Sequence, residues 1–199
     1  MSLRKSYTLL APVYDGFLRR VSSRPRAASL SFLEVPQGAP VLLAGIGTGL
    51  DLPHLPQGPR YVGLDLTYAM LARVPRGYAD VALVQGDVMR MPFADASFAA
   101  VVLHLIVAVV PDAARCLAEA ERVACPGARL LVLDKFLRPG QRAPLRRAAN
   151  RISRRLATRL DVVFEEALES APALEVEHDT PMFAGGWFRS IVLRKRAVR

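Results

Sequence analysis

Three glycines and two aspartates are the residues of this sequence whose types and spacing most directly suggest chemistry. Gly45, Gly47 and Gly49 follow the apolar run VLLA, while Asp65 ends the run YVGLD and Asp87 comes just after VALVQ. Glycine permits positive φ and has no Cβ, so a nucleotide-like group can lie directly on such a turn. A carboxylate at the end of the following strand can accept hydrogen bonds from both hydroxyls of a ribose. The pattern therefore predicts a nucleoside-binding site.

The spacing favours adenosine as the nucleoside. Asp65 lies 20 positions after Gly45, a separation typical of a ribose-binding carboxylate. Asp87 is placed to accept a hydrogen bond from an exocyclic amine, which favours adenine. Taken singly, the glycines also fit a tight loop without a ligand, and each aspartate also fits a loop or cap position. Three sites in register favour the ligand-binding interpretation.

Motifs that bind phosphate are missing from the same stretch. The dinucleotide motif G-x-G-x-x-G requires glycine where this chain has Leu50, and no Gly-Lys-Ser/Thr follows Gly49. The predicted ligand is therefore an adenosine without phosphates. Cys116 and Cys125 have no metal-ligand spacing, so we expect two reduced cysteines and no metal site.

Alternating strands and helices must bring these residues together. Apolar runs predict strands over 41–45, 60–65, 80–85, from Phe98 onward and over 128–134. A helix is predicted over 17–33, with a break near Pro25. Further helices are predicted to start after Gly49, at Tyr68 and at Asp112, and to cover 141–160 and FEEALESA. A hairpin is predicted around Gly185 and Gly186. This alternation predicts an α/β fold whose parallel strands place their carboxyl ends at one ligand-binding edge.

Length and charge set the wider organisation. A chain of 199 residues predicts a single domain. The sequence has no apolar run of about 18 residues and no continuous apolar leader, so we expect a cytoplasmic protein. The net charge of +9 is concentrated in residues 1–33, which carry +5, and residues 136–160, which carry +8. The stretches that hold the motifs are nearly neutral, so the positive charge acts through these two appendages.

Four of the motifs together resemble a known family. Residues 41–140 resemble class I S-adenosylmethionine-dependent methyltransferases through GIGTG, VGLDLTYAML, QGDVMRMPFADASF and AERVACPGARLLVLDKF. The opening YTLLAPVYD, the stretch GLDLPHLP and the tail GGWFRSIVLRK resemble the group of quinone C-methyltransferases and bacterial phosphatidylethanolamine N-methyltransferases, the methyltransferases of type 11.

The resemblance implies a cofactor, a fold and roles for residues. It implies S-adenosylmethionine, with methionine and ribose against the three glycines, the ribose hydroxyls on Asp65, and adenine beside Leu66, Asp87 and Val88. It implies a Rossmann-like, seven-stranded and mostly parallel sheet with an antiparallel last strand and helices on both faces. It also implies that the segment around Tyr7 and Tyr14 folds over the site as a lid.

A single methyltransferase domain would then span residues 1–199. Its expected parts are an N-terminal helical lid (1–33), a cofactor-binding core (34–135), a basic helical segment (136–171) and a C-terminal β-hairpin (172–199). The expected activity is methyl transfer to a small hydrophobic or lipid acceptor, either a phospholipid amine or a quinone.

Two positions depart from the family's pattern. Members usually carry an acid two positions before the first glycine, where it helps to hold the methionine ammonium, and this chain has Leu43 there; the residue after Phe98, often Asp, is Ala99. Losing a charge-assisted hydrogen bond of about 1.5–3 kcal/mol weakens cofactor binding roughly ten- to hundredfold. Asp51 is a neighbouring acid that could compensate. The alternative function is a cofactor-weak or degenerate relative that acts as a membrane- or nucleic-acid-binding module.

One histidine is a candidate for proton transfer. Methyl transfer from a sulfonium is an in-line displacement, so the protein mainly has to align donor and acceptor. His104, at the end of the strand that starts near Phe98, is the candidate catalytic base. The alternative is a hydrogen-bonded histidine on an apolar strand, with no part in the reaction.

The second basic appendage predicts an amphipathic helix. Such a helix suits an anionic membrane surface, where each arginine contributes on the order of 1 kcal/mol. A solvated helix that packs on the sheet is the first alternative, and nucleic acid is less favoured because the helix offers no aromatic platform for bases. The predicted membrane-facing residues are Arg142, Arg146, Arg147, Arg151, Arg154 and Arg155. We therefore expect peripheral contact with an anionic membrane.

Overall fold

The chain folds around one twisted, mostly parallel sheet. The computed structural model describes residues 22–77, 81–138, 140, 161–183 and 186–197. Seven strands lie in the order β3-β2-β1-β4-β5-β7-β6, and β7 runs antiparallel to both of its neighbours. Their bounds are β1 Pro40–Ala44, β2 Arg60–Asp65, β3 Val81–Gln85, β4 Phe98–His104, β5 Ala124–Lys135, β6 Leu174–Phe183 and β7 Phe188–Lys195. The predicted fold class is confirmed.

The central strands are apolar on both faces because both faces are covered. Side chains of β1, β4 and β5 alternate between two hydrophobic clusters, one on each side of the sheet. Val101 and Leu130 belong to the first cluster and are fully buried, while Val102 and Leu131 beside them belong to the second. Continuous apolar runs are typical of parallel strands buried in this way.

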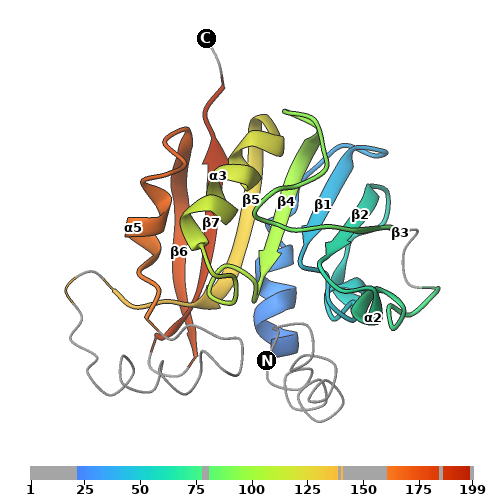
Figure 1. Cartoon of the computed structure of the whole chain (residues 1–199), viewed down its shortest axis with the longest axis horizontal. Coiled ribbons are helices and arrows are strands. Elements are labelled where there is room, and N and C mark those ends of the chain that lie inside the picture. Colours follow the sequence, from blue (N-terminus) through green and yellow to red (C-terminus); the bar gives the residue numbers. More distant parts are fainter. Residues whose placement is uncertain (1–21, 78–80, 139, 141–160, 184–185, 198–199) are drawn as a thin grey trace.

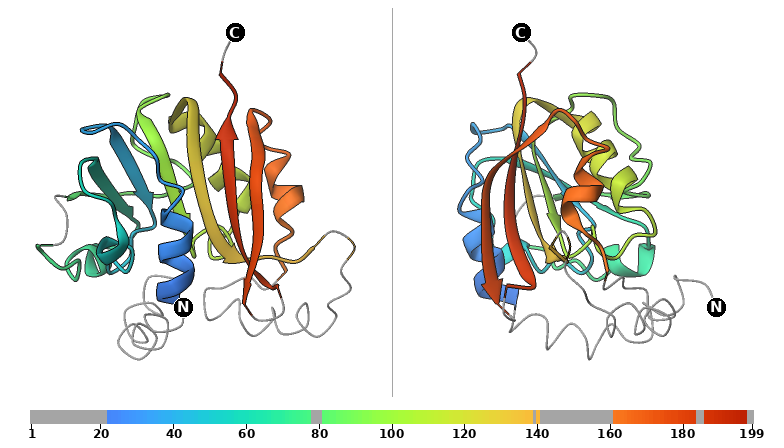
Figure 2. Two further views of the ribbon diagram at one scale, coloured as in Figure 1. Left: turned by 180° about the vertical axis from the view of Figure 1, so that it is seen from behind. Right: turned by 90° about the vertical axis from the view of Figure 1, so that its left-hand side faces the viewer.

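Helices cover the two faces (Figures 1 and 2). Helix α3 (Ala113–Val123) and helix α5 (Phe164–Leu168) lie on one face, and a helix over residues 22–30 lies on the other. The short 3-10 helix η1 (Leu52–His54) and helix α2 (Tyr68–Leu71) follow β1 and β2. Asp112 caps α3 by accepting the Arg115 N–H at 2.9 Å, which satisfies one donor of the first turn.

Three local expectations differ from the structure. The helix over residues 22–30 runs through Pro25 without a break, because proline removes only one helix hydrogen bond and neighbouring side chains of the helix are buried against the sheet. Strand β5 starts at Ala124, directly after α3, rather than at residue 128. Helix α2 contains a single turn and ends at Leu71. Residues 1–21, which hold Tyr7 and Tyr14 of the expected lid (1–33), and residues 141–160, the predicted basic helix, lie outside the described residues.

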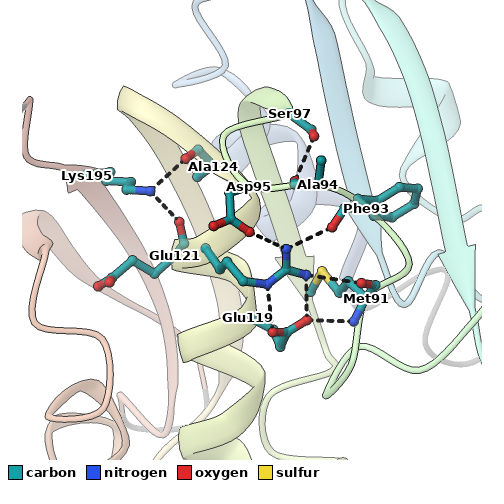
Figure 3. A network of polar contacts seen from close by, with 10 residues as sticks. Met91, Phe93, Ala94, Asp95, Ser97, Glu119, Glu121, Ala124 and Lys195 are labelled. Atoms are coloured by element: carbon teal, nitrogen blue, oxygen red, sulfur yellow. Dashed lines mark hydrogen bonds and ion pairs between the residues drawn. The ribbon is translucent and has the colours of Figure 1, made fainter.

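A network around Arg122 fixes the segment that leads from β3 into β4 (Figure 3). The Arg122 guanidinium donates to the Met91 and Phe93 carbonyls and to the Asp95 and Glu119 carboxylates, at 2.7–3.1 Å. Glu119 Oε2 also accepts the Met91 N–H at 2.7 Å. The hydrogen bond from Arg122 lowers the pKa of Glu119, so the pair stays charged at neutral pH. The network therefore holds residues 91–95 against α3.

Removing Arg122 should loosen this segment. We expect Arg122→Ala to lower the free energy of unfolding by about 1–3 kcal/mol, because several charge-assisted bonds and two backbone carbonyls lose their donor. Urea unfolding measures the change. Arg73→Ala, which removes an exposed arginine, should change stability by less than about 0.5 kcal/mol. Equal effects of the two substitutions would contradict the structural role of the network.

Candidate active site

The predicted glycine turn lies at the point where the strand order reverses. Strand β1 pairs with β2 on one side and with β4 on the other, and the chain leaves the carboxyl end of β1 between them. Open α/β sheets bind ligands at such a reversal, outside the carboxyl ends of the strands. Gly45 and Ile46 both donate their N–H to the Leu64 carbonyl, at 2.8 and 3.0 Å, so the turn begins tightly against β2.

Glycine is required in this turn for two different reasons. All three residues have positive φ, +73° for Gly45, +57° for Gly47 and +82° for Gly49. A Cβ on Gly45 would lie 2.7 Å from the Ile106 side chain, and one on Gly49 would lie 2.8 Å from Leu52, so these two positions serve internal packing. A Cβ on Gly47 would meet nothing nearer than 4.0 Å. Gly47 is therefore the glycine with open space for a ligand.

Asp65 joins the two loops that follow β1 and β2. Its Oδ2 accepts the Gly47 N–H at 3.0 Å, and its Oδ1 accepts the Thr67 N–H at 2.9 Å and the Thr67 hydroxyl at 3.0 Å. A carboxylate has about four acceptor positions, so three are in use. The structure places Asp65 beside the glycine turn, as the sequence predicted, and it shows a second role in holding that turn.

The residues expected around adenine gather near the next strand. Asp87 follows β3, and its Oδ1 accepts the Met89 N–H at 2.8 Å. Leu66 follows β2 and is 47% exposed, whereas Val88 is buried. An exposed leucine beside a carboxylate offers an apolar surface for an aromatic base and an acceptor for its amine. The open space at Gly47 and these neighbours fit an adenosyl group.

A second polar cluster, which includes Asp51 from the segment after the turn, is almost fully buried. Asp51 Oδ1 accepts a hydrogen bond from Arg26 Nη1 at 2.7 Å and lies 2.7 Å from Nδ1 of His104. Nε2 of His104 lies 3.0 Å from the Ser29 hydroxyl, and Arg26 Nε donates to the Ser22 hydroxyl at 3.1 Å. Both ring nitrogens of the candidate base His104 therefore have partners, and its side chain is fully buried. These contacts correspond to the alternative of a hydrogen-bonded structural histidine.

The charges of this cluster are compensated within it. Burial by itself would raise the pKa of Asp51, but the neighbouring His104 and Arg26 side chains hold the pKa of that carboxyl well below its usual range. A second contact, 3.1 Å between the Ser23 hydroxyl and Nε2 of His54, links the same helix to η1. The cluster therefore fastens the helix over residues 22–30 to the end of β4 and to the segment after the glycine turn.

One further residue at this edge, Asp134, was not predicted from the sequence. Asp134 is fully buried near the end of β5, where its Oδ2 accepts the Ala108 N–H at 2.9 Å and its Oδ1 accepts the Lys135 N–H at 2.8 Å. Burial raises the pKa of Asp134, although Lys135 and the two backbone donors favour the charged form. The signal was present, because Asp134 ends the run ARLLVLD as Asp65 ends YVGLD.

Other predicted residues cannot be placed. Tyr7 and Tyr14 lie outside the described residues, and so do the six arginines expected at the membrane surface. In the described part of the chain, no group of His, Cys, Asp and Glu could hold a metal ion. No helix within the described ranges is long and apolar enough to cross a membrane.

Comparisons with known proteins agree with this geometry. Residues 42–132 match a family model described as a methyltransferase domain. The chain is 31% identical over 202 residues to a phosphatidylethanolamine N-methyltransferase of Cereibacter sphaeroides, and the match covers 98% of each chain. It is 38% identical over 110 residues to a demethylmenaquinone methyltransferase of Beutenbergia cavernae, which covers 55% of this chain and 46% of that protein.

A solved structure shows the same fold. The structure of a geranyl diphosphate methyltransferase in complex with S-adenosylmethionine superposes with a TM-score of 0.73 at 18% identity, and the match covers 91% of this chain and 87% of that one. That structure shows the fold, and the similarity to the Cereibacter sphaeroides enzyme over 98% of both chains establishes the family. The chain belongs to the S-adenosylmethionine-dependent methyltransferases, and it is an enzyme that uses S-adenosylmethionine as its cofactor.

Proposed function

We propose that this enzyme methylates the amine of a phospholipid headgroup. The observation that carries the proposal is the similarity to the Cereibacter sphaeroides phosphatidylethanolamine N-methyltransferase, which extends over 98% of both chains. A similarity of that extent includes the segments outside the cofactor core, where acceptor pockets are formed. The two basic appendages support the proposal, because an anionic membrane is the environment of such a substrate.

The cofactor in this proposal is held by the residues at the sheet edge. Asp65 would accept from a ribose hydroxyl through its one unused acceptor position, Asp87 Oδ2 would accept from the adenine amine, and Leu66 and Val88 would contact the ring. Support comes from the open space at Gly47, the 47% exposure of Leu66, and the single hydrogen bond that Asp87 makes through Oδ1 among the described residues.

The chain's contribution to the reaction is alignment. When bound, S-adenosylmethionine supplies a methyl group made electrophilic by its sulfonium. The protein has to hold the acceptor nitrogen in line with that methyl group and admit the amine without its proton. His104 remains a predicted base, but its two hydrogen bonds favour a positioning role. The expected lid around Tyr7 and Tyr14 would exclude water from the site.

A quinone is the second candidate acceptor. The demethylmenaquinone methyltransferase similarity has the higher identity, 38%, but it spans 46% of that protein. Both candidates are found in membranes, so both agree with a basic surface. They differ in the atom that is methylated, nitrogen in one case and ring carbon in the other, which makes them separable by product.

The acceptor is tested by supplying both candidates. We expect incubation with S-adenosylmethionine labelled in its methyl group to label phosphatidylethanolamine in vesicles that also contain phosphatidylglycerol. Demethylmenaquinone in vesicles of phosphatidylcholine and phosphatidylglycerol should remain unlabelled. Thin-layer chromatography of the extracted lipids identifies the products. Label in the quinone alone would replace the first proposal with the second.

The ribose assignment is tested by Asp65→Asn. The asparagine keeps the size of the side chain but loses the negative charge and one acceptor, so we expect S-adenosylhomocysteine to bind about ten- to hundredfold more weakly by calorimetry. Thr67→Val is the matched control, since it removes only one hydroxyl contact to the same carboxylate. Unchanged affinity in a folded Asp65→Asn protein would contradict the assignment.

The membrane contact is tested by a matched pair of double substitutions. Arg146→Gln with Arg147→Gln should weaken sedimentation with phosphatidylglycerol vesicles by about tenfold or more, because each arginine near the headgroups contributes on the order of 1 kcal/mol. Arg73→Gln with Arg76→Gln removes the same charge from exposed positions near α2 and should leave binding unchanged. Equal loss in both proteins would indicate a net-charge effect and argue against a dedicated membrane surface.

A further inference from the structure

The buried ion pair between Arg26 and Asp51 lies at the end of the glycine turn in the chain. Asp51 is two positions after Gly49, and consecutive turns hold it there, since Gly49 N–H donates to the Ile46 carbonyl at 3.0 Å and Leu52 N–H donates to the Gly49 carbonyl at 3.1 Å. The Arg26 and Asp51 side chains are each 7% exposed and meet at 2.7 Å. Through His104, the pair also contacts the carboxyl end of β4, the second strand at the reversal point.

Asp51 and Arg26 each have one hydrogen-bonding atom to which no described residue forms a hydrogen bond. Asp51 makes both of its hydrogen bonds through Oδ1, to Arg26 and His104, and Arg26 makes its bonds through Nε and Nη1. Among the described residues, Oδ2 of Asp51 and Nη2 of Arg26 have no hydrogen-bond partner. One carboxylate oxygen and one guanidinium nitrogen of this ion pair are therefore left for a group that carries both signs of charge.

The free-energy cost of burying two charged side chains favours a ligand-binding role for this pair. Taking two charges out of water costs several kcal/mol per ion, and an apolar pair of similar size often stabilises a fold equally well. Attachment of a helix alone does not require this pair, because Leu30 and Leu33 of the same segment already pack with Leu43 in the hydrophobic cluster on this face. On this face the chain has Leu43 where the family usually carries an acid, and Asp51 supplies an acid there instead.

We propose that Arg26 and Asp51 form the binding site for the amino-acid end of S-adenosylmethionine. Asp51 Oδ2 accepts a hydrogen bond from the α-ammonium, and Arg26 Nη2 donates to the α-carboxylate. Ligand group and ion pair are each neutral overall, so binding places no net charge in the buried site. This inference concerns the cofactor, and it holds whether the methyl acceptor is a phospholipid or a quinone.

The experiment compares two ligands that differ in the amino-acid group. S-adenosylhomocysteine carries that group, and 5′-methylthioadenosine has the same nucleoside and thioether without it. We expect the wild-type protein to bind the first at least about tenfold more tightly by calorimetry, the equivalent of one charge-assisted hydrogen bond. Asp51→Asn and Arg26→Met should each remove most of this preference by weakening S-adenosylhomocysteine alone.

Ser29→Ala is the matched control. It removes the hydroxyl beside His104 Nε2 and leaves the ion pair in place, so thermal stability should fall while the preference between the two ligands is kept. A wild-type protein without the preference would overturn the proposal, and this result does not depend on whether a variant folds. Equal weakening of both ligands by Asp51→Asn or Arg26→Met would also overturn it, since that outcome indicates a purely structural ion pair.

Discussion

One carboxylate, that of Asp51, joins three parts of the chain that are distant in sequence. It contacts Arg26 of the helix over residues 22–30 and His104 at the end of β4, and it lies in the segment that follows the glycine turn. Removing Arg26 would leave the Asp51 carboxylate without its guanidinium partner in a buried place, which is far costlier than losing a surface ion pair. The Asp51 side chain therefore links the helix, the strand end and the turn, in addition to the apolar packing of Leu30 and Leu33 on the same face.

Aspartates also link neighbouring segments elsewhere along the carboxyl edge of the sheet. Three further aspartates end or follow strands and accept backbone N–H groups from the adjoining loops: Asp65 at the end of β2, Asp87 after β3 and Asp134 near the end of β5. Loops at such an edge cannot satisfy their amides within the sheet, so a carboxylate is the nearest strong acceptor. The edge is thus built from acids that order backbone, and some of them retain an oxygen for a ligand.

The fold and the cofactor edge could be predicted from the sequence because both depend on local signals. Apolar runs that end in Asp65 or precede Asp87 define strands and their carboxyl ends, and alternation with helices makes the sheet parallel. The cluster around His104 could not be predicted in the same way. Its partners Ser29 and Asp51 are 75 and 53 positions away, and only packing of the helix against the sheet brings them together. For the same reason, the sequence left two roles open for His104, a candidate base and a hydrogen-bonded structural histidine, and the structure shows both of its ring nitrogens engaged.

The bond from the Gly47 amide to Asp65 has a consequence for how the nucleoside is received. Because the loops after β1 and β2 are already tied to each other, their conformational entropy is lost when the chain folds and is not lost again on association. The edge is preorganised, and affinity for the adenosine part depends on the integrity of the folded loops as much as on direct contacts. The hydrogen bond from Gly47 to Asp65 therefore contributes both to the folding of this edge and to the binding of the nucleoside.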